Sequence, residues 1–132
     1  PQETFGARII FPDDKIVAYT TDNEPFDPLC PDPRLVALAE NADVWITDCQ
    51  YTKDTYEGVR TVPRHGWGHS YPNAVAATAV KAKVKTVVNF HHDPGSTDEN
   101  IKLICSQTAE LIKNMGGNSK VIAAYEGLDI SL

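Results

Sequence analysis

The sequence predicts an α/β fold, in which helices pack against a largely parallel β-sheet. Strand-like and helix-like segments alternate along almost the whole chain, an order typical of parallel strands joined by right-handed helical crossovers. The chain has 132 residues, of which 42% are hydrophobic and 23% charged, and this suits a globular domain with a modest core. We therefore expect residues 1–132 to form a single domain.

The first part of the chain predicts a hairpin, a loop and a helix. Ala7–Phe11 and Lys15–Thr20 form the hairpin around a Pro-Asp-Asp turn, and the prolines of Asn23–Pro33 predict a loop. Asp32 followed by Pro33 is typical of a helix start. The apolar residues that share one face of this helix are Leu35, Leu38, Ala39 and Ala42.

The rest of the chain alternates between strands and helices. Strands are predicted at Asp43–Thr47, Lys85–Phe90 and Lys120–Tyr125, with an alanine-rich helix at Pro72–Lys83 between the first two. The clearest helix begins after the N-cap Thr97 and ends at a Gly-Gly pair. Its apolar stripe consists of Ile101, Ile104, Cys105, Thr108, Leu111, Ile112 and Met115.

The charge and the cysteines limit the classes of function. The net charge is −6 and no run of Lys and Arg forms a basic stripe, which disfavours nucleic acid as a partner. A small anionic ligand is compatible with this charge where a bound metal ion supplies positive charge locally. Cys30, Cys49 and Cys105 are odd in number and form no CxxC pair, which indicates reduced thiols in a cytoplasmic protein.

The hydropathy and the first residues bear on location and length. No apolar run approaches the roughly 20 residues of a membrane span, so no membrane is expected among the partners. The start Pro1–Thr4 is not typical of a signal peptide. Because the sequence does not begin with Met, we expect a processed product or a piece of a longer protein.

Polar residues of the acid–base and metal-binding types follow three of the predicted strands. Asp22, Asp48 and the pair His91-His92 each stand where a strand ends. In open α/β sheets, ligands bind at the carboxyl ends of the strands, and parallel strands bring those ends to one edge. We therefore expect these side chains to lie close together.

The histidines sharpen this expectation, because all four lie between His65 and His92. His69 follows Gly-Trp-Gly and leads into a helix start, where free backbone N–H groups suit an anion such as phosphate. Carboxylates and imidazoles without a neighbouring cysteine suit zinc, manganese or iron. The residues thus indicate a metal site that handles an anionic substrate.

Each of these residues also has a structural interpretation. Asp22 is equally typical of an Asx turn at a loop start, and Asp48 of a capping carboxylate. His65 is more typical of a solvated loop residue than of a ligand. Adjacent strand residues face opposite sides, so at most one of His91 and His92 serves a given site. Gly-Trp-Gly alone also suits a tight turn with a packed indole.

Several segments in order carry a resemblance to a known family. They are Ile16–Asp22, Ala42–Tyr51, Gly68–Ser70, Val87–Pro94 and the ending Ala123–Leu132. Together they resemble the metallo-β-lactamase superfamily, in particular its ribonuclease Z and phosphodiesterase-like branch. The resemblance covers nearly the whole chain, and the first four of these segments, in the correct order, make it specific.

The resemblance implies a fold, a set of roles and an activity. The fold is half of the αββα sandwich, a mixed sheet with three helices on one face. Asp22 takes the place of the carboxylate that bridges two metals, and His91 that of the last histidine ligand. His69 matches the histidine at the scissile phosphate, oriented by Asp48. The implied function is metal-dependent hydrolysis of a small phosphodiester with two divalent ions, with zinc favoured over manganese or iron.

The sequence also departs from this family. The main metal motif, His-x-His-x-Asp-His, is absent, as is the histidine ligand that normally precedes a stretch like Pro1–Ile9. Two protein ligands cannot hold two metals, because structural zinc alone takes about four. We therefore expect this chain to be the C-terminal half of the fold, inactive in isolation and completed by an N-terminal half or, as a dimer, a second copy. The alternative is a non-catalytic binding or assembly module.

Overall fold

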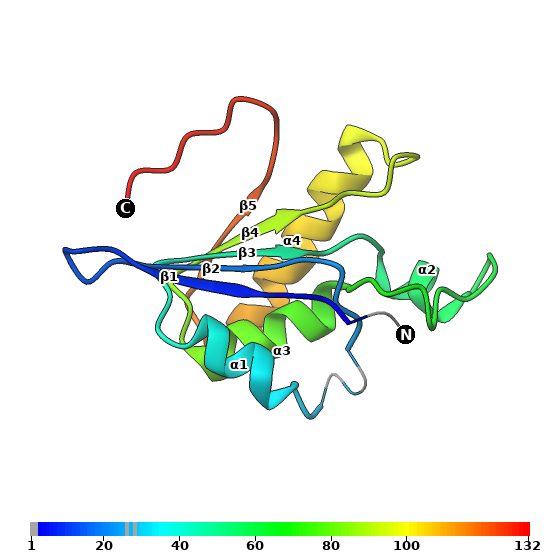
Figure 1. Ribbon diagram of the computed structural model, residues 1–132. Helices are drawn as coiled ribbons and strands as arrows, with labels where there is room; N and C mark the ends of the chain where they lie inside the picture. Colours follow the sequence, from blue (N-terminus) through cyan, green and yellow to red (C-terminus); the bar gives the residue numbers. More distant parts are fainter. Residues whose placement is uncertain (1–2, 26, 28) are drawn as a thin grey trace.

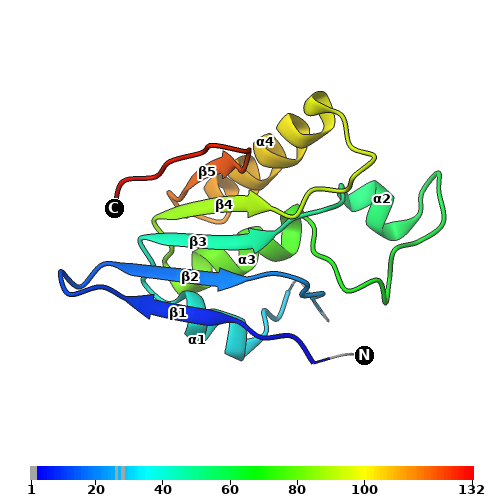
Figure 2. The ribbon, with the colours of Figure 1, turned by 45° about the horizontal axis from the view of Figure 1, so that its top comes forward.

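One mixed five-stranded sheet forms the centre of the computed structural model, which describes residues 3–25, 27 and 29–132. The strands are β1 (Ala7–Ile10), β2 (Ile16–Thr20), β3 (Val44–Asp48), β4 (Thr86–Phe90) and β5 (Lys120–Ala123). They lie side by side in sequence order, with β1 antiparallel to β2 and all other neighbours parallel (Figure 2). The predicted loop Asn23–Pro33 includes positions 26 and 28, which lie outside the described residues.

Three helices cover one face of this sheet. They are α1 (Pro33–Ala39), α3 (Pro72–Ala82) and α4 (Asp98–Asn114), and all lie on the same side (Figure 1). Right-handed crossovers that advance in one direction along a sheet place their helices on one face. The predicted fold class, a mixed sheet with three helices on one face, is therefore confirmed. Among the described residues, no helix combines the length and hydrophobicity needed to cross a membrane.

The loop after β3 contains a fourth helix that the sequence pattern did not predict. This helix, α2 (Lys53–Glu57), has five residues, too few to show an apolar period. Its start is capped by Thr52, whose hydroxyl accepts a hydrogen bond from the Thr55 N–H at 3.2 Å. At its end Gly58 has φ 75°, a left-handed conformation that glycine adopts without steric cost.

The core lies between the sheet and its helices. Ala18, Trp45 and Val87 are aligned across β2, β3 and β4, and each is almost fully buried. The Trp45 indole satisfies its buried N–H by donating to Thr20 Oγ1 at 2.8 Å. The buried alanines of α3 belong to the same apolar cluster as Ala18, Trp45 and Val87.

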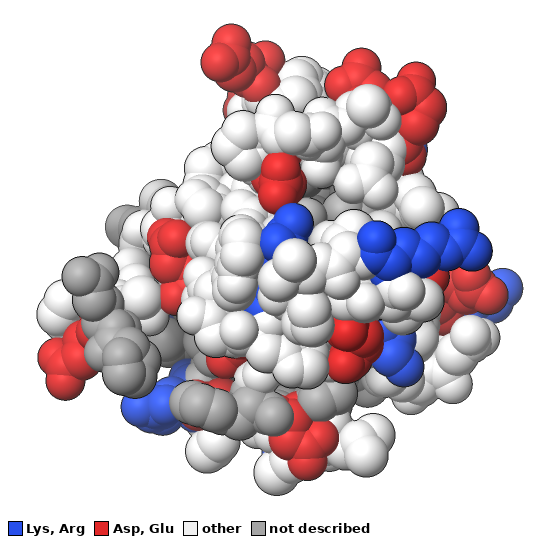
Figure 3. Space-filling view, turned by 90° about the vertical axis from the view of Figure 1, so that its right-hand side faces the viewer, with Lys and Arg blue, Asp and Glu red and all other residues white. Residues whose placement is uncertain are grey.

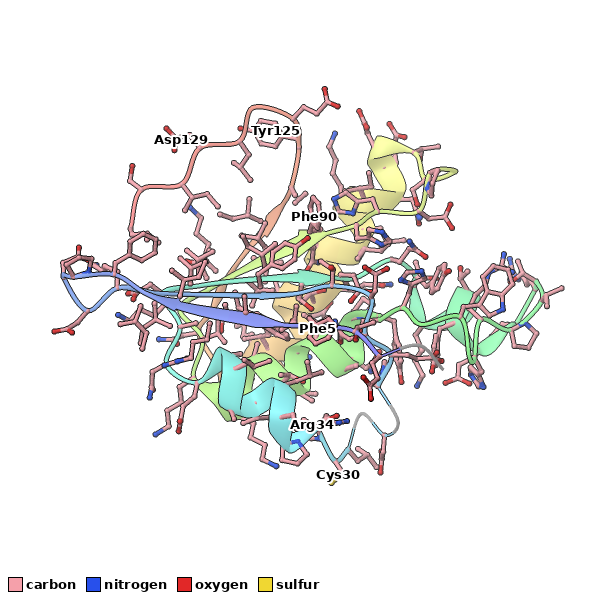
Figure 4. The ribbon with its side chains drawn as sticks, viewed as in Figure 1. Phe5, Cys30, Arg34, Phe90, Tyr125 and Asp129 are labelled. Atoms are coloured by element: carbon pink, nitrogen blue, oxygen red, sulfur yellow. The ribbon has the colours of Figure 1, made fainter. Side chains whose placement is uncertain are left out.

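The opposite face of the sheet carries exposed apolar side chains. Ile9 is 48% exposed, and Tyr19 and Phe90 are each 38% exposed. The C-terminal segment with Tyr125 and Asp129 runs on this side, away from the helix-covered face (Figure 4). This is the exposure expected of one layer of a two-layer sandwich.

Asp43 connects three strands at their amino ends. Its Oδ2 accepts a hydrogen bond from the Ile16 N–H at 2.9 Å, and its Oδ1 accepts one from Lys85 Nζ at 2.7 Å. The hydrogen bond from Lys85 lowers the pKa of the Asp43 carboxyl below its ordinary value of 3.8. A lowered folded-state pKa contributes stability above the unfolded-state pKa, and this stability is lost as the pH falls through the folded-state value.

Asp43→Asn is therefore expected to lower the urea midpoint of unfolding slightly at about pH 7 and less as the pH approaches about 2. Urea titrations at several pH values measure this difference. Asp129→Asn, on the exposed C-terminal segment, is the matched control and should leave the midpoint unchanged throughout. If the difference in urea midpoint between Asp43→Asn and the unchanged chain grew as the pH fell, the expected pH dependence would be contradicted.

Candidate functional site

The predicted site residues meet at the carboxyl edge of β2, β3 and β4. Asp48 is the last residue of β3, whereas the sequence predicted a strand that ends at Thr47, with Asp48 just after it. His91 directly follows β4. Asp22 follows β2 by two residues, and His69 arrives from the loop that leads into α3. Figure 3 views the molecule from this edge, where acidic and basic side chains are scattered over a largely uncharged surface.

Two of these residues have an unusual backbone conformation. Asp22 has φ 54° and His91 has φ 55°, both in the left-handed region that non-glycine residues rarely adopt. The other non-glycine residues in this region, Asp14, Asn41 and Lys83, lie at turns or a helix end. Such conformations cost free energy and concentrate at functional sites. At Asp22 and His91 they accompany side chains that come together at the sheet edge.

Asp22, His69 and His91 form a compact group of potential metal ligands. Asp22 Oδ1 lies 3.8 Å from His91 Nε2 and 4.0 Å from His69 Nδ1, and each residue offers a ligand atom within 4.8 Å of the others. The two imidazole centroids are 5.0 Å apart. The structure thus brings Asp22 and His91 within reach of one ion, and it adds His69 as a third donor.

This donor set can be tested against the chemistry of a divalent metal. One carboxylate and two imidazoles match the three protein ligands of a catalytic zinc ion, which keeps a further position open. Asp22 is about half exposed, so a ligand can approach from solvent. A pair of ions would need donors beyond these three. The three residues fill the protein ligands of one divalent ion only when His69 is among them, and Asp22 with His91 alone leaves the coordination of that ion incomplete.

The buried Asp48 and the partly exposed His69 form a pair beside this group. His69 Nδ1 lies 3.1 Å from Asp48 Oδ2, and the Asp48 side chain is fully buried. The hydrogen bond to Asp48 raises the pKa of His69 above 6.5. Burial raises the pKa of Asp48 above 3.8, although its hydrogen bond with His69 opposes this shift. The pair therefore favours the protonated form of the His69 ring more than a free imidazole would.

Two residues next to Asp22 hold this arrangement, and sequence reasoning missed both. Asn23 Nδ2 donates to Asp48 Oδ1 at 2.8 Å, which leaves Oδ2 for His69. Glu24 accepts hydrogen bonds from the loop that precedes His69. Their position directly after Asp22 was the only signal, and neighbours of a candidate ligand in sequence do not by themselves indicate a role.

Gln50 was missed for the same reason. Its Nε2 lies 3.3 Å from His91 Nδ1 and 3.2 Å from the His91 carbonyl oxygen. An amide N–H can only donate, so Nδ1 is the acceptor and a neutral His91 ring carries its proton on Nε2, the nitrogen that faces Asp22. Metal binding at Nε2 therefore requires the Gln50 amide to turn, so that its oxygen accepts from Nδ1–H. Partners of this kind set the tautomer and orientation of histidine ligands.

The other two histidines lie outside the group. His92 Nε2 lies 3.2 Å from the Ala124 carbonyl oxygen at the end of β5, so His92 points away as predicted for a neighbour of His91. His65 Nε2 lies 3.2 Å from Glu57 Oε2 on the loop surface, and its side chain is 55% exposed. His65 is thus the solvated loop residue that the sequence predicted.

Comparisons with known proteins identify the fold. No family model and no curated protein sequence matches the chain. Among solved structures, the chain is similar to the metallo-β-lactamase fold protein YhfI from Bacillus subtilis, with a TM-score of 0.66 and 18% sequence identity. The similarity covers 92% of this chain and 41% of that one, so the chain spans less than half of the YhfI structure. The described chain therefore has the architecture of one part of a metallo-β-lactamase fold.

Proposed function

We propose that this chain contributes part of the metal site of a hydrolase that cleaves a small phosphodiester. One observation carries the proposal: Asp22, His69 and His91 converge at the carboxyl edge of the sheet, with buried Asp48 directly behind His69. Two imidazoles and a carboxylate gathered at one solvent-accessible edge are typical of a metal or catalytic site.

The chemistry follows from the position of each residue. A divalent ion at this site would lower the pKa of a bound water and polarise a phosphoryl oxygen. Asp22 and His91 would hold the ion, with the Gln50 amide turned so that its oxygen accepts from His91 Nδ1. His69 would donate the proton of its Nε2 to the leaving oxygen, while Asp48 accepts the hydrogen bond of Nδ1. Zinc is the favoured ion, with manganese and iron as alternatives.

A complete site needs donors from outside this chain. We propose that they come from an N-terminal half of the same fold or from a second copy of the chain, either of which would also cover Ile9, Tyr19 and Phe90. The similarity to only 41% of the YhfI chain supports an arrangement in which further polypeptide completes the domain. The isolated chain is then expected to bind metal weakly and to be nearly inactive.

The proposal is tested on the polypeptide in which the chain naturally occurs, by metal analysis and hydrolysis of bis(p-nitrophenyl) phosphate. His91→Ala is expected to lower metal affinity by more than about 10-fold, the smallest loss typical of changes around a metal site, and to lower the rate with it. His92→Ala, next to it but bound to Ala124, is the control and should retain metal.

Three outcomes would contradict this proposal. Equal metal loss in both variants would contradict the site, and stoichiometric metal without hydrolysis would favour a binding or assembly module. Enzyme-like hydrolysis by the isolated chain would show that no further donors are needed.

A further inference from the structure

The loop that leads to His69 is tied to the candidate site by one carboxylate. Glu24 Oε1 accepts hydrogen bonds from the Gly66 N–H at 2.7 Å and from the Tyr56 hydroxyl at 2.8 Å. Glu24 Oε2 accepts one from the Gly68 N–H at 2.8 Å. Since Glu24 stands two residues after Asp22, the loop has a defined position relative to the candidate metal ligands.

This loop presents an arginine stacked on an exposed indole. The Arg64 guanidinium lies 4.2 Å from the centre of the Trp67 ring, and Trp67 is 54% exposed. Arg64 also lies 6.0 Å from the centre of the Tyr51 ring. The Tyr51 ring is in turn 6.0 Å from that of His69, in an edge-on arrangement. A continuous row of rings and one cation thus leads from Trp67 to the candidate site.

Arg64 has no ion pair or side-chain hydrogen bond to any of the residues that the structure describes, and its Nε is buried without a partner. This is unusual in a chain with a net charge of −6, where acidic partners outnumber basic ones. When a guanidinium stacks on an aromatic ring, its N–H groups point outward in the plane of the guanidinium, where they can bind a phosphate. Arg64 therefore has unused capacity for an anion close to the candidate site.

We propose that Arg64 and Trp67 form a nucleotide subsite, in which Trp67 stacks on the base and Arg64 binds a phosphate oxygen. This inference rests on the proposed function and names its substrate class as nucleotides. Arginine and tryptophan are also enriched at protein interfaces. The tether through Glu24 and the row of rings that ends at His69 favour a small substrate over a protein partner.

The test measures binding of AMP to the chain by saturation-transfer NMR of the ligand, with EDTA present. Arg64→Gln and Trp67→Leu are each expected to weaken binding by about tenfold, the loss typical of a stacking or charged contact. Val62→Ser changes an exposed residue of the same loop and should leave binding unchanged. Adenosine and ribose 5-phosphate, which each carry half of the recognised features, should bind more weakly than AMP.

The outcomes separate this inference from the proposed hydrolase. Binding that depends on Arg64 and Trp67 supports the subsite even if the chain binds no metal, because EDTA is present throughout. Absence of AMP binding, or equal binding by all variants, overturns the subsite whether or not metal is bound. Adenosine that binds as well as AMP overturns the role of Arg64. Self-association or partner binding that depends on Trp67, without AMP binding, assigns the surface to a protein interface instead.

Discussion

Replacing His69 by alanine is expected to leave metal content unchanged and to lower phosphodiester turnover by about 10²–10⁴-fold, the usual contribution of a general acid. The comparison is with Asp22→Ala and His91→Ala, each of which should lower metal content and turnover together. Metal analysis and turnover are measured on the polypeptide in which the chain naturally occurs, with all variants prepared in parallel.

The reason for separating His69 from the other two donors lies in its hydrogen bond to Asp48. A metal-bound imidazole must be neutral, whereas a general acid must carry a proton. Asp48 raises the pKa of His69 and so favours the protonated ring. Although His69 lies within ligand distance of Asp22 and His91, its Nδ1, which is 4.0 Å from Asp22 Oδ1, is the nitrogen bonded to Asp48 and so is not free to bind an ion beside Asp22.

The opposite pattern would reverse this assignment. If metal content fell in His69→Ala and stayed full in His91→Ala, His69 would be a ligand and the Asp48 contact would orient it for the metal. His65→Ala is the control, because His65 lies on the same loop and pairs with Glu57 at the surface. Its turnover and metal content should match those of the unchanged protein.

Most of the fold could be predicted because the signals for its elements are local. Thr97 caps α4 by accepting a hydrogen bond from the Asn100 N–H at 3.3 Å, as its sequence position indicated. The stripe of this helix was also correct in its centre, where Ile104, Thr108 and Ile112 are buried. Met115 is 45% exposed because it forms the C-cap, where the chain leaves the helical path.

The site was predicted from strand ends, and this rule reaches only residues at, or within two positions of, the end of a strand. It located Asp22, Asp48 and His91, because parallel strands bring their carboxyl ends to one edge. It could not locate Glu24, whose hydrogen bonds to Gly66 and Gly68 join segments more than 40 residues apart. Such contacts depend on how the loops fold over the edge, and no local pattern encodes them.

Asp48 has the most demanding hydrogen-bond environment in the candidate site. Its Oδ1 accepts from Asn23 Nδ2 at 2.8 Å, and its Oδ2 faces His69 Nδ1 at 3.1 Å and the Ser70 N–H at 3.3 Å. Asn23 Nδ2 also donates to the Thr20 carbonyl oxygen at 3.1 Å, which holds the amide group in this orientation. Both oxygens of Asp48 thus face donors that cannot easily turn away.

Asp48→Asn is therefore expected to lower the free energy of unfolding by about 1–3 kcal/mol, the cost of a buried donor left without an acceptor. Whichever way the new amide turns, its NH₂ group faces either Asn23 or the pair His69 and Ser70. The pKa of His69, followed by NMR, should also fall towards 6.5 because the carboxylate that raises it is gone. Asp13→Asn at an exposed turn is the isosteric control for urea unfolding. A variant as stable as the unchanged chain, with an unaltered His69 titration, would show that Asp48 does not hold His69 in solution.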